Sequence, residues 1–249
     1  MLFSRRLFLA SASSAGFVGS CGGGNTPPPP PPPGPPPPGT VNFAFSFADN
    51  LAGWEPACAD FALGQEASIA FAFGHERLPA PLNDRSGLYL ESHNQSDDVF
   101  MYIVRRLDGL PAGTRYRVRT NVTIATNAPP GCVGVGGAPG EGVTVKAGAC
   151  GFRPENRVEQ GFVRVNFDKG NQAQGGAHVV VIGNLAQDSP AGTCLQPAYQ
   201  RKMLTTGGNG PLVTSDSSGR LWLVIGTDSG FEGLTRVYVL EGSVILTPA

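Results

Sequence analysis

Charged side chains are scarce in this chain of 249 residues, and tryptophan is scarcer still. Asp, Glu, Lys and Arg together make up 15% of the residues, and the formal net charge at pH 7 is -1. Proteins that bind nucleic acid carry a basic stripe or patch, and this sequence has none. Nucleic acid is therefore excluded as a partner. With only two tryptophans, an aromatic binding surface has few candidates.

Sequence patterns that would identify a particular chemistry are also missing. The glycine-rich segment 134–142 is not followed by Lys-Ser or Lys-Thr and opens no helix, which excludes a phosphate loop. A serine nucleophile needs a base, but none of the three histidines lies in a partner motif for Ser229. No Cys-x-x-Cys pair is present, so the cysteine spacing argues against zinc.

The first 21 residues have the three parts of an export signal. Arg5 and Arg6 supply the positive start, a weakly apolar stretch covers residues 7–18, and two small residues precede Cys21. The stretch is too short and too polar to span a bilayer, which takes about 20 mostly apolar residues. We expect residues 1–20 to be removed as a signal peptide.

Two resemblances make this signal more specific. Residues 4–10, S-R-R-L-F-L-A, resemble the twin-arginine signal of bacteria, which implies export of a protein that is already folded. Residues 18–21, V-G-S-C, resemble the bacterial lipobox, which implies that Cys21 is acylated and becomes the new N-terminus. A plain secretory signal, with Cys21 as an ordinary residue, is the alternative.

The lipobox resemblance also implies a location. A lipid on Cys21 would anchor the protein to a membrane of the bacterial cell envelope, facing the periplasm or the cell surface. The outer membrane is favoured, because Gly22 rather than Asp follows the cysteine.

Residues 21–40 form a linker that is rich in glycine and proline. Prolines fill positions 27–38 apart from Gly34. Proline runs lack backbone donors and adopt an extended left-handed helix. At about 3.1 Å per residue, this run reaches roughly 35–40 Å. We predict a disordered, semi-rigid spacer that holds a domain off the membrane; a proline-rich ligand for a partner domain is the alternative.

Four cysteines remain if Cys21 is acylated: Cys58, Cys132, Cys150 and Cys194. An even number in an oxidising compartment predicts two disulfides, for which three connectivities exist. We favour Cys132 with Cys150, because these two bracket a glycine-rich excursion, and that choice leaves Cys58 with Cys194.

Short segments of alternating apolar and polar residues, typical of strands with one buried face, recur from residue 41 to the end of the chain. They lie at 41–47, 67–73, 87–92, 99–107, 116–126, 162–167, 178–182, 220–226 and 235–246. No segment has convincing helical periodicity. The predicted fold class is all-β, an antiparallel β-sandwich that forms a single domain over 41–249. Loops at 128–146 and 186–214 are long enough to be functional or pinned by disulfides.

Two segments resemble parts of known β-sandwiches. Residues 107–118, L-D-G-L-P-A-G-T-R-Y-R-V, are similar to a turn and strand of jelly-roll carbohydrate-binding modules, in which the Leu and Tyr enter the core. Residues 235–246 resemble the closing strand of such modules. Fibronectin-like sandwiches use similar turns. Segments 96–102, 131–141 and 226–233 also resemble a group of bacterial lipoproteins that implies no activity. The first resemblance implies a jelly-roll-like fold.

Acidic residues in loops are the candidate metal ligands. They are Asp97, Asp98, Asp168, Asp228 and Glu232. Calcium takes six to eight oxygen ligands from such groups, and extracellular sandwiches often carry one structural calcium ion. The alternative is turn chemistry, in which Asp bonds its own backbone. Lys169, beside Asp168, opposes a cation.

Trp54 follows Gly53 in a loop and is the candidate ligand-binding residue, either stacking on a sugar or capping the end of the sandwich. Trp222 lies within an apolar run and is expected in the core. We therefore predict a non-catalytic binding or structural module, with carbohydrate as the natural ligand. The alternative is an envelope hydrolase that uses the acidic loops. Nothing in the sequence indicates an oligomeric state.

Overall fold

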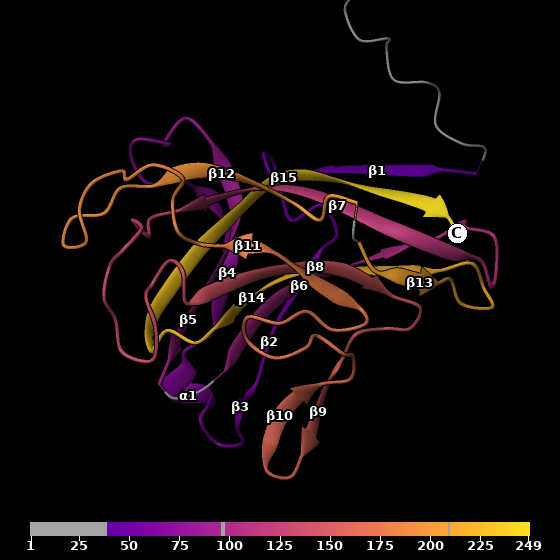
Figure 1. Ribbon diagram of the computed structural model, residues 1–249, viewed down its shortest axis with the longest axis horizontal. Helices are drawn as coiled ribbons and strands as arrows, with labels where there is room; N and C mark the ends of the chain where they lie inside the picture. The colour runs from indigo at the N-terminus through magenta and orange to yellow at the C-terminus, as the bar shows by residue number, and fades with distance from the viewer. Residues whose placement is uncertain (1–38, 96–97, 209) are drawn as a thin grey trace, which may run out of the picture. The chain divides into compact units, whose positions relative to one another are not determined.

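Alternating side chains produce fifteen strands and one short helix in the computed structural model (Figure 1). The structure describes residues 39–95, 98–208 and 210–249. Arg5, Arg6, Cys21 and Asp97 lie outside the described residues. Every strand pairing is antiparallel, as predicted. No helix among the described residues has the length and apolarity of a membrane span.

The larger sheet has seven strands, in the order β12-β7-β15-β5-β4, with β1 paired to β15 and β13 paired to β7. Strand β15 is 16 residues long, so β5 and β1 pair with successive parts of the same edge. The strands are β1 (Val41–Ser46), β4 (Ala72–Arg77), β5 (Ser86–Asn94), β7 (Arg115–Thr126), β12 (Gln200–Thr205), β13 (Leu212–Thr214) and β15 (Gly233–Pro248).

The second sheet has five strands, in the order β11-β8-β14-β6-β2. All nine residues of β14 and all eight of β8 are buried, so both faces of this sheet are covered along its centre. The strands are β2 (Glu55–Ala59), β6 (Val99–Leu107), β8 (Val143–Cys150), β11 (Val179–Asn184) and β14 (Leu221–Ser229).

A small third sheet and a single helical turn complete the fold. Strands β3 (Phe61–Ala62), β10 (Phe162–Val165) and β9 (Asn156–Glu159) pair in that order, and Figure 1 shows β9 and β10 as a projecting hairpin. The helical turn is α1 (Glu66–Ile69).

The core lies between the two large sheets, because side chains alternate along each strand. On β6, Met101 and Ile103 point inward and join the main core, whereas Tyr102 and Val104 join a second apolar cluster on the outer face. Tyr116, which the jelly-roll resemblance places in the core, is fully buried there. The β-sandwich prediction is confirmed.

Some local predictions were wrong. Residues 67–73 were expected to form one strand, but α1 ends at Ile69, Ala70 is left-handed with φ 47°, and pairing resumes only at Ala72. The expected loops at 128–146 and 186–214 contain part of β8 and all of β12 and β13. Strand β8 is buried on both faces, so it lacks the polar alternation that marks the other strands.

The predicted disulfide pairing was also wrong. Cys132 is bonded to Cys194, whereas Cys58 and Cys150 are free and buried. Only one disulfide is present among the described residues, where two were predicted. Cys58 and Cys150, which this pairing leaves over, cannot form a second one because they lie on β2 and β8, which are separated in the sheet by β14 and β6. Burial raises the pKa of both free thiols to about 12, so neither is a reactive thiolate.

The disulfide should stabilise the fold by joining two loops. Cys132 and Cys194 are 62 residues apart, and closing a loop of that length in the unfolded chain corresponds to at most about 4 kcal/mol. We expect Cys132→Ala with Cys194→Ala to lower the free energy of unfolding by about 2–4 kcal/mol in urea titrations. The control is dithiothreitol, which should destabilise the native protein and leave the double variant unchanged. Equal sensitivity of both proteins to dithiothreitol would contradict this account.

Candidate functional site

The outer face of the five-stranded sheet is covered at one end and open at the other. At the covered end, Phe167 packs on Phe100 and Tyr102, with ring centroids 6.2 and 5.7 Å apart, and Val163 of β10 joins the same cluster. Beyond Tyr102 this cover stops. The open end is a groove of about 820 Å³, here called the outer-face groove. It is lined by Gly53, Glu55, Pro56, Ala57, Tyr102, Val104, Arg105, Arg106, Asp108, Arg153, Pro154, Glu155, Asn156, Arg220 and Trp222.

The floor of the outer-face groove is aromatic and firmly held. Tyr102 of β6 and Trp222 of β14 both project to the outer side of the sheet, where they belong to the same apolar cluster. The Tyr102 hydroxyl donates to Asn156 Oδ1 at 2.8 Å, and Asn156 Nδ2 donates to the Cys58 carbonyl at 2.8 Å. Burial raises the pKa of the Tyr102 phenol well above its usual range, so this hydroxyl stays protonated and keeps its bond to Asn156.

One wall of the groove is an arginine between two glutamates. Arg153 Nη2 lies 2.8 Å from Glu55 Oε2 of β2, and Arg153 Nε lies 3.6 Å from Glu155 Oε1. All three side chains are more than half exposed, so the pairs contribute little to stability. They present charged donors and acceptors to the groove.

Two further arginines of the groove are paired with carboxylates in the same way. Arg106 Nε lies 3.0 Å from Asp108 Oδ2, and Arg220 Nε lies 2.8 Å from Asp216 Oδ2. The Arg220 guanidinium carbon is 5.5 Å from the centroid of the Trp222 ring. The groove therefore presents mainly paired donors and acceptors, since its two aromatic side chains are almost fully buried, Tyr102 at 1% and Trp222 at 8% exposure.

Both tryptophans are buried. Trp54, the predicted ligand-binding residue, is only 2% exposed and packs in the core against Phe45, with ring centroids 4.9 Å apart. Its ring is therefore not available to stack on a sugar, which leaves the alternative of a packing role. Trp222 is buried, as expected, in the apolar cluster on the outer face of the five-stranded sheet. The alternation of residues along a strand does not show which of its two faces will line a groove.

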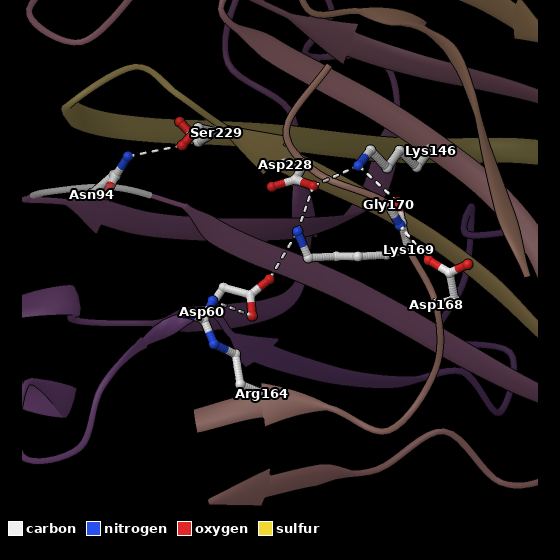
Figure 2. A network of polar contacts seen from close by, with 9 residues as sticks. All are labelled: Asp60, Asn94, Lys146, Arg164, Asp168, Lys169, Gly170, Asp228 and Ser229. Carbon is white, nitrogen blue, oxygen red and sulfur yellow. Dashed lines mark hydrogen bonds and ion pairs between the residues drawn. The ribbon is translucent and has the colours of Figure 1, made fainter. Parts of the chain in front are cut away.

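A buried ion network lies under the cover at the other end of the sheet (Figure 2). Asp228 of β14 and Lys146 of β8 are both fully buried, and Lys146 Nζ lies 2.6 Å from Asp228 Oδ2. Lys169 lies two residues after Phe167, in the segment that covers this end of the outer face. Its Nζ is 2.7 Å from the same oxygen and 2.9 Å from Asp60 Oδ2. Figure 2 shows Asp228 held between the two lysine side chains.

The network balances its own charge. Arg164 Nη1 donates to Asp60 Oδ1 at 3.1 Å. Asp60, Asp98 and Asp228 each place a carboxylate oxygen within 4.8 Å of the others. Three carboxylates therefore face two lysines and one arginine. Buried charges are tolerated when they are paired in this way.

Burial and pairing act against each other on the pKa values in the network. Burial lowers the pKa of Lys146 and raises the pKa of Asp228, because both charged forms lose their hydration. Burial also acts to lower the pKa of Lys169, but the charges of Asp228 and Asp60 outweigh it and raise that pKa. Lys169 therefore keeps its positive charge within the network.

The predicted calcium ligands come together only in part. Asp98 and Asp228 share the acidic cluster, whose three carboxylates lie close enough to give one metal ion a ligand atom each. The third member, Asp60, was missed, because it follows a strand that the sequence did not reveal. Glu232 is not in the cluster. The set fits calcium poorly, since lysine ammonium groups already contact Asp60 and Asp228.

Asp168 stabilises a turn, which was the alternative to calcium binding. Its carboxylate accepts backbone N–H bonds from Gly170 at 2.9 Å and Ala177 at 2.8 Å. These bonds lower the pKa of Asp168. The residue thus closes the turn that places Lys169 over the sheet.

The ion network predicts a specific pattern of stabilities. Asp228→Ala leaves two buried lysines without a shared counter-charge and should lower the free energy of unfolding by about 3–5 kcal/mol in urea titrations. Lys146→Met combined with Asp228→Leu should cost less, because no unpaired charge remains and Lys169 keeps Asp60. A double variant less stable than Asp228→Ala would contradict the network described here.

No protein-family model matches this chain, and no curated protein matches it in sequence. Solved structures with a related arrangement include a cleaved adhesin domain of Lys-gingipain from Porphyromonas gingivalis, at 12% identity over 82% of this chain and 97% of that one, with a TM-score of 0.39. A family 11 carbohydrate-binding module of a Clostridium thermocellum cellulase has 10% identity over 84% of this chain and 95% of its own, with a TM-score of 0.36. A module specific for non-crystalline cellulose has 14% identity over 82% and 91%, also with a TM-score of 0.36. At these identities and TM-scores the likeness assigns no ligand to this chain.

Proposed function

We propose that this protein is a lipid-anchored protein of the bacterial envelope whose β-sandwich binds a glycan, without catalysis, in the outer-face groove. The observation that carries the proposal is the groove itself. Its lining combines paired arginines and carboxylates with the small exposed part of Trp222, which is 8% exposed.

The chemistry of the groove suits a sugar. A sugar ring has apolar C–H faces and a rim of hydroxyl groups that both donate and accept hydrogen bonds. Arginine donates and carboxylate accepts hydrogen bonds, and the exposed part of Trp222 offers a small apolar contact. A volume of about 820 Å³ lies within the usual range for ligand sites.

The groove is also held rigid. Its floor lies on β6 and β14, which are paired over nine residues. The Tyr102–Asn156–Cys58 hydrogen bonds tie its edge to β2 and β9. A preformed site loses little conformational entropy on binding, which supports recognition of a flexible oligosaccharide.

A hydrolase is the second candidate, and the geometry favours it less. A glycosidase needs two carboxyl groups about 5–10 Å apart with the scissile bond between them. In the groove, Arg153 lies between Glu55 and Glu155 and contacts both. Of the acidic loop residues, Asp228 is held by lysines and Asp168 by backbone N–H groups.

The envelope part of the proposal rests on residues 1–40. Acylation of Cys21 would fix the protein to the membrane, and the proline run would set the sandwich off from it. Such a tether suits capture of a polymer at or beyond the membrane surface.

Glycan binding is tested by two matched arginine variants. Arg153→Ala removes a groove arginine that pairs with a glutamate at 2.8 Å, and Arg201→Ala removes an arginine with the same pairing on the other sheet. On a glycan array followed by calorimetry, we expect the first change to weaken binding about tenfold, the value of one charged hydrogen bond, and the second to leave it unchanged. Failure of the native protein to bind any glycan would refute the proposal, as would equal losses in both variants.

The anchor is tested separately in cells. Labelled palmitate should enter the native protein but not the Cys21→Ser variant, because the thiol is the acceptor. Arg5→Lys combined with Arg6→Lys should leave the precursor inside the cell if the twin-arginine route is used. Palmitate labelling of Cys21→Ser would contradict lipidation at this residue, and normal export of the paired-lysine variant would contradict the route.

A further inference from the structure

One arginine of the outer-face groove differs from the other three. Arg106, Arg153 and Arg220 are each paired with a carboxylate at 2.8–3.0 Å. Arg105 also lines the groove, but within the part of the chain that the structure describes it has neither a hydrogen bond nor an ion pair. The groove therefore holds one positive charge without a protein partner.

Arg105 packs closely against Gly53. Its Nη1 lies only 1.6 Å from the place of a Cβ atom at position 53, so a larger residue there would displace the end of this flexible side chain. Gly53 also has a φ of 71°, a conformation that glycine adopts without strain. The guanidinium is thus seated against the Gly53 backbone at one end of the groove.

In this position part of the Arg105 guanidinium lacks a hydrogen-bond partner. The side chain is half-buried, and its Nε is buried with no hydrogen-bond partner. A buried donor without a partner costs free energy, and more so when it is charged. A ligand in the groove cannot reach this buried Nε. The two Nη groups also lack a partner among the described residues but are not buried in the same way, so an anionic ligand group would pair with them.

We propose that the outer-face groove is specific for an acidic sugar, a uronic acid, whose carboxylate is bound by Arg105. This inference rests on the proposed glycan function and names its ligand class. The planar guanidinium fork matches a carboxylate through two parallel hydrogen bonds. The sugar ring then lies along the groove from Gly53 toward Trp222, and the three paired arginines and their carboxylates meet its hydroxyl groups.

The placement of charges in the groove, rather than their sum, favours an acid over a neutral sugar. The four arginines are matched in number by four carboxylates, because Arg153 contacts both Glu55 and Glu155. Arg105 is the one arginine among them that has no carboxylate of the described residues within ion-pair distance. A neutral sugar would cover Arg105 and leave it desolvated without an anion, which is unfavourable. A uronate would neutralise it.

The test compares acidic polymers with neutral copies of themselves. The full-length protein is titrated with oligomers of polygalacturonate and of polymannuronate, and with the same oligomers after their carboxyl groups are reduced to alcohols. Dextran sulfate and dextran form a third pair. We expect at least tenfold tighter binding to one carboxylated oligomer than to its reduced form, and a smaller preference as salt is raised from 0.05 to 0.5 M, because salt screens the charge.

Two variants assign that preference to Arg105. Arg105→Gln should abolish the preference for the acid and leave binding of the reduced oligomer close to that of the native protein. Arg119→Gln removes the same charge from an exposed position on β7 of the other sheet and should change neither.

The outcomes separate this inference from the proposed function. Tight binding of neutral glycans with no preference for acids overturns the inference and leaves glycan binding standing. A preference that survives Arg105→Gln overturns the role of Arg105, and a preference for sulfate alone overturns the carboxylate. Binding to no glycan, acidic or neutral, overturns the inference together with the function on which it rests.

Discussion

The contact between Lys169 and the buried carboxylates Asp60 and Asp228 determines what the outer face of the five-stranded sheet can do. Both faces of β14 carry side chains that must be kept from water, and the larger sheet covers only one of them. Lys169 brings its own segment down onto the other face, where Phe167 completes the apolar cover. The cover ends near Tyr102, and the groove begins there.

The same arrangement explains why binding suits this surface better than catalysis. Catalytic carboxyl groups need freedom to exchange protons, and their pKa values are usually shifted within an accessible cleft. Here burial shifts the pKa values of Lys146 and Asp228, which are fully buried under the cover. The accessible charges of the groove are paired arginines and carboxylates on the surface.

The sequence predicted most of the fold and little of the site, for a physical reason. Strands with one polar face, such as β1 and β7, alternate visibly and were found near their true bounds. Strand β8 is buried on both faces and was read as loop. The site depends on which face of each strand is open, and that follows from the covering segment, not from local pattern. The sequence therefore did not show that Trp222, rather than Trp54, borders the groove, and Asp60 was missed.

The two tryptophans also provide the most direct test of the central claim, that the outer-face groove is where a glycan binds. Trp222 lies in the groove, and Trp54 is buried in the core. Their two indole N–H signals can be followed by NMR during titration of the labelled protein with acidic and neutral oligosaccharides. The account predicts that the Trp222 signal shifts with saturation while the Trp54 signal stays in place. A Trp222 signal that does not move while shifts appear on the seven-stranded sheet would contradict it.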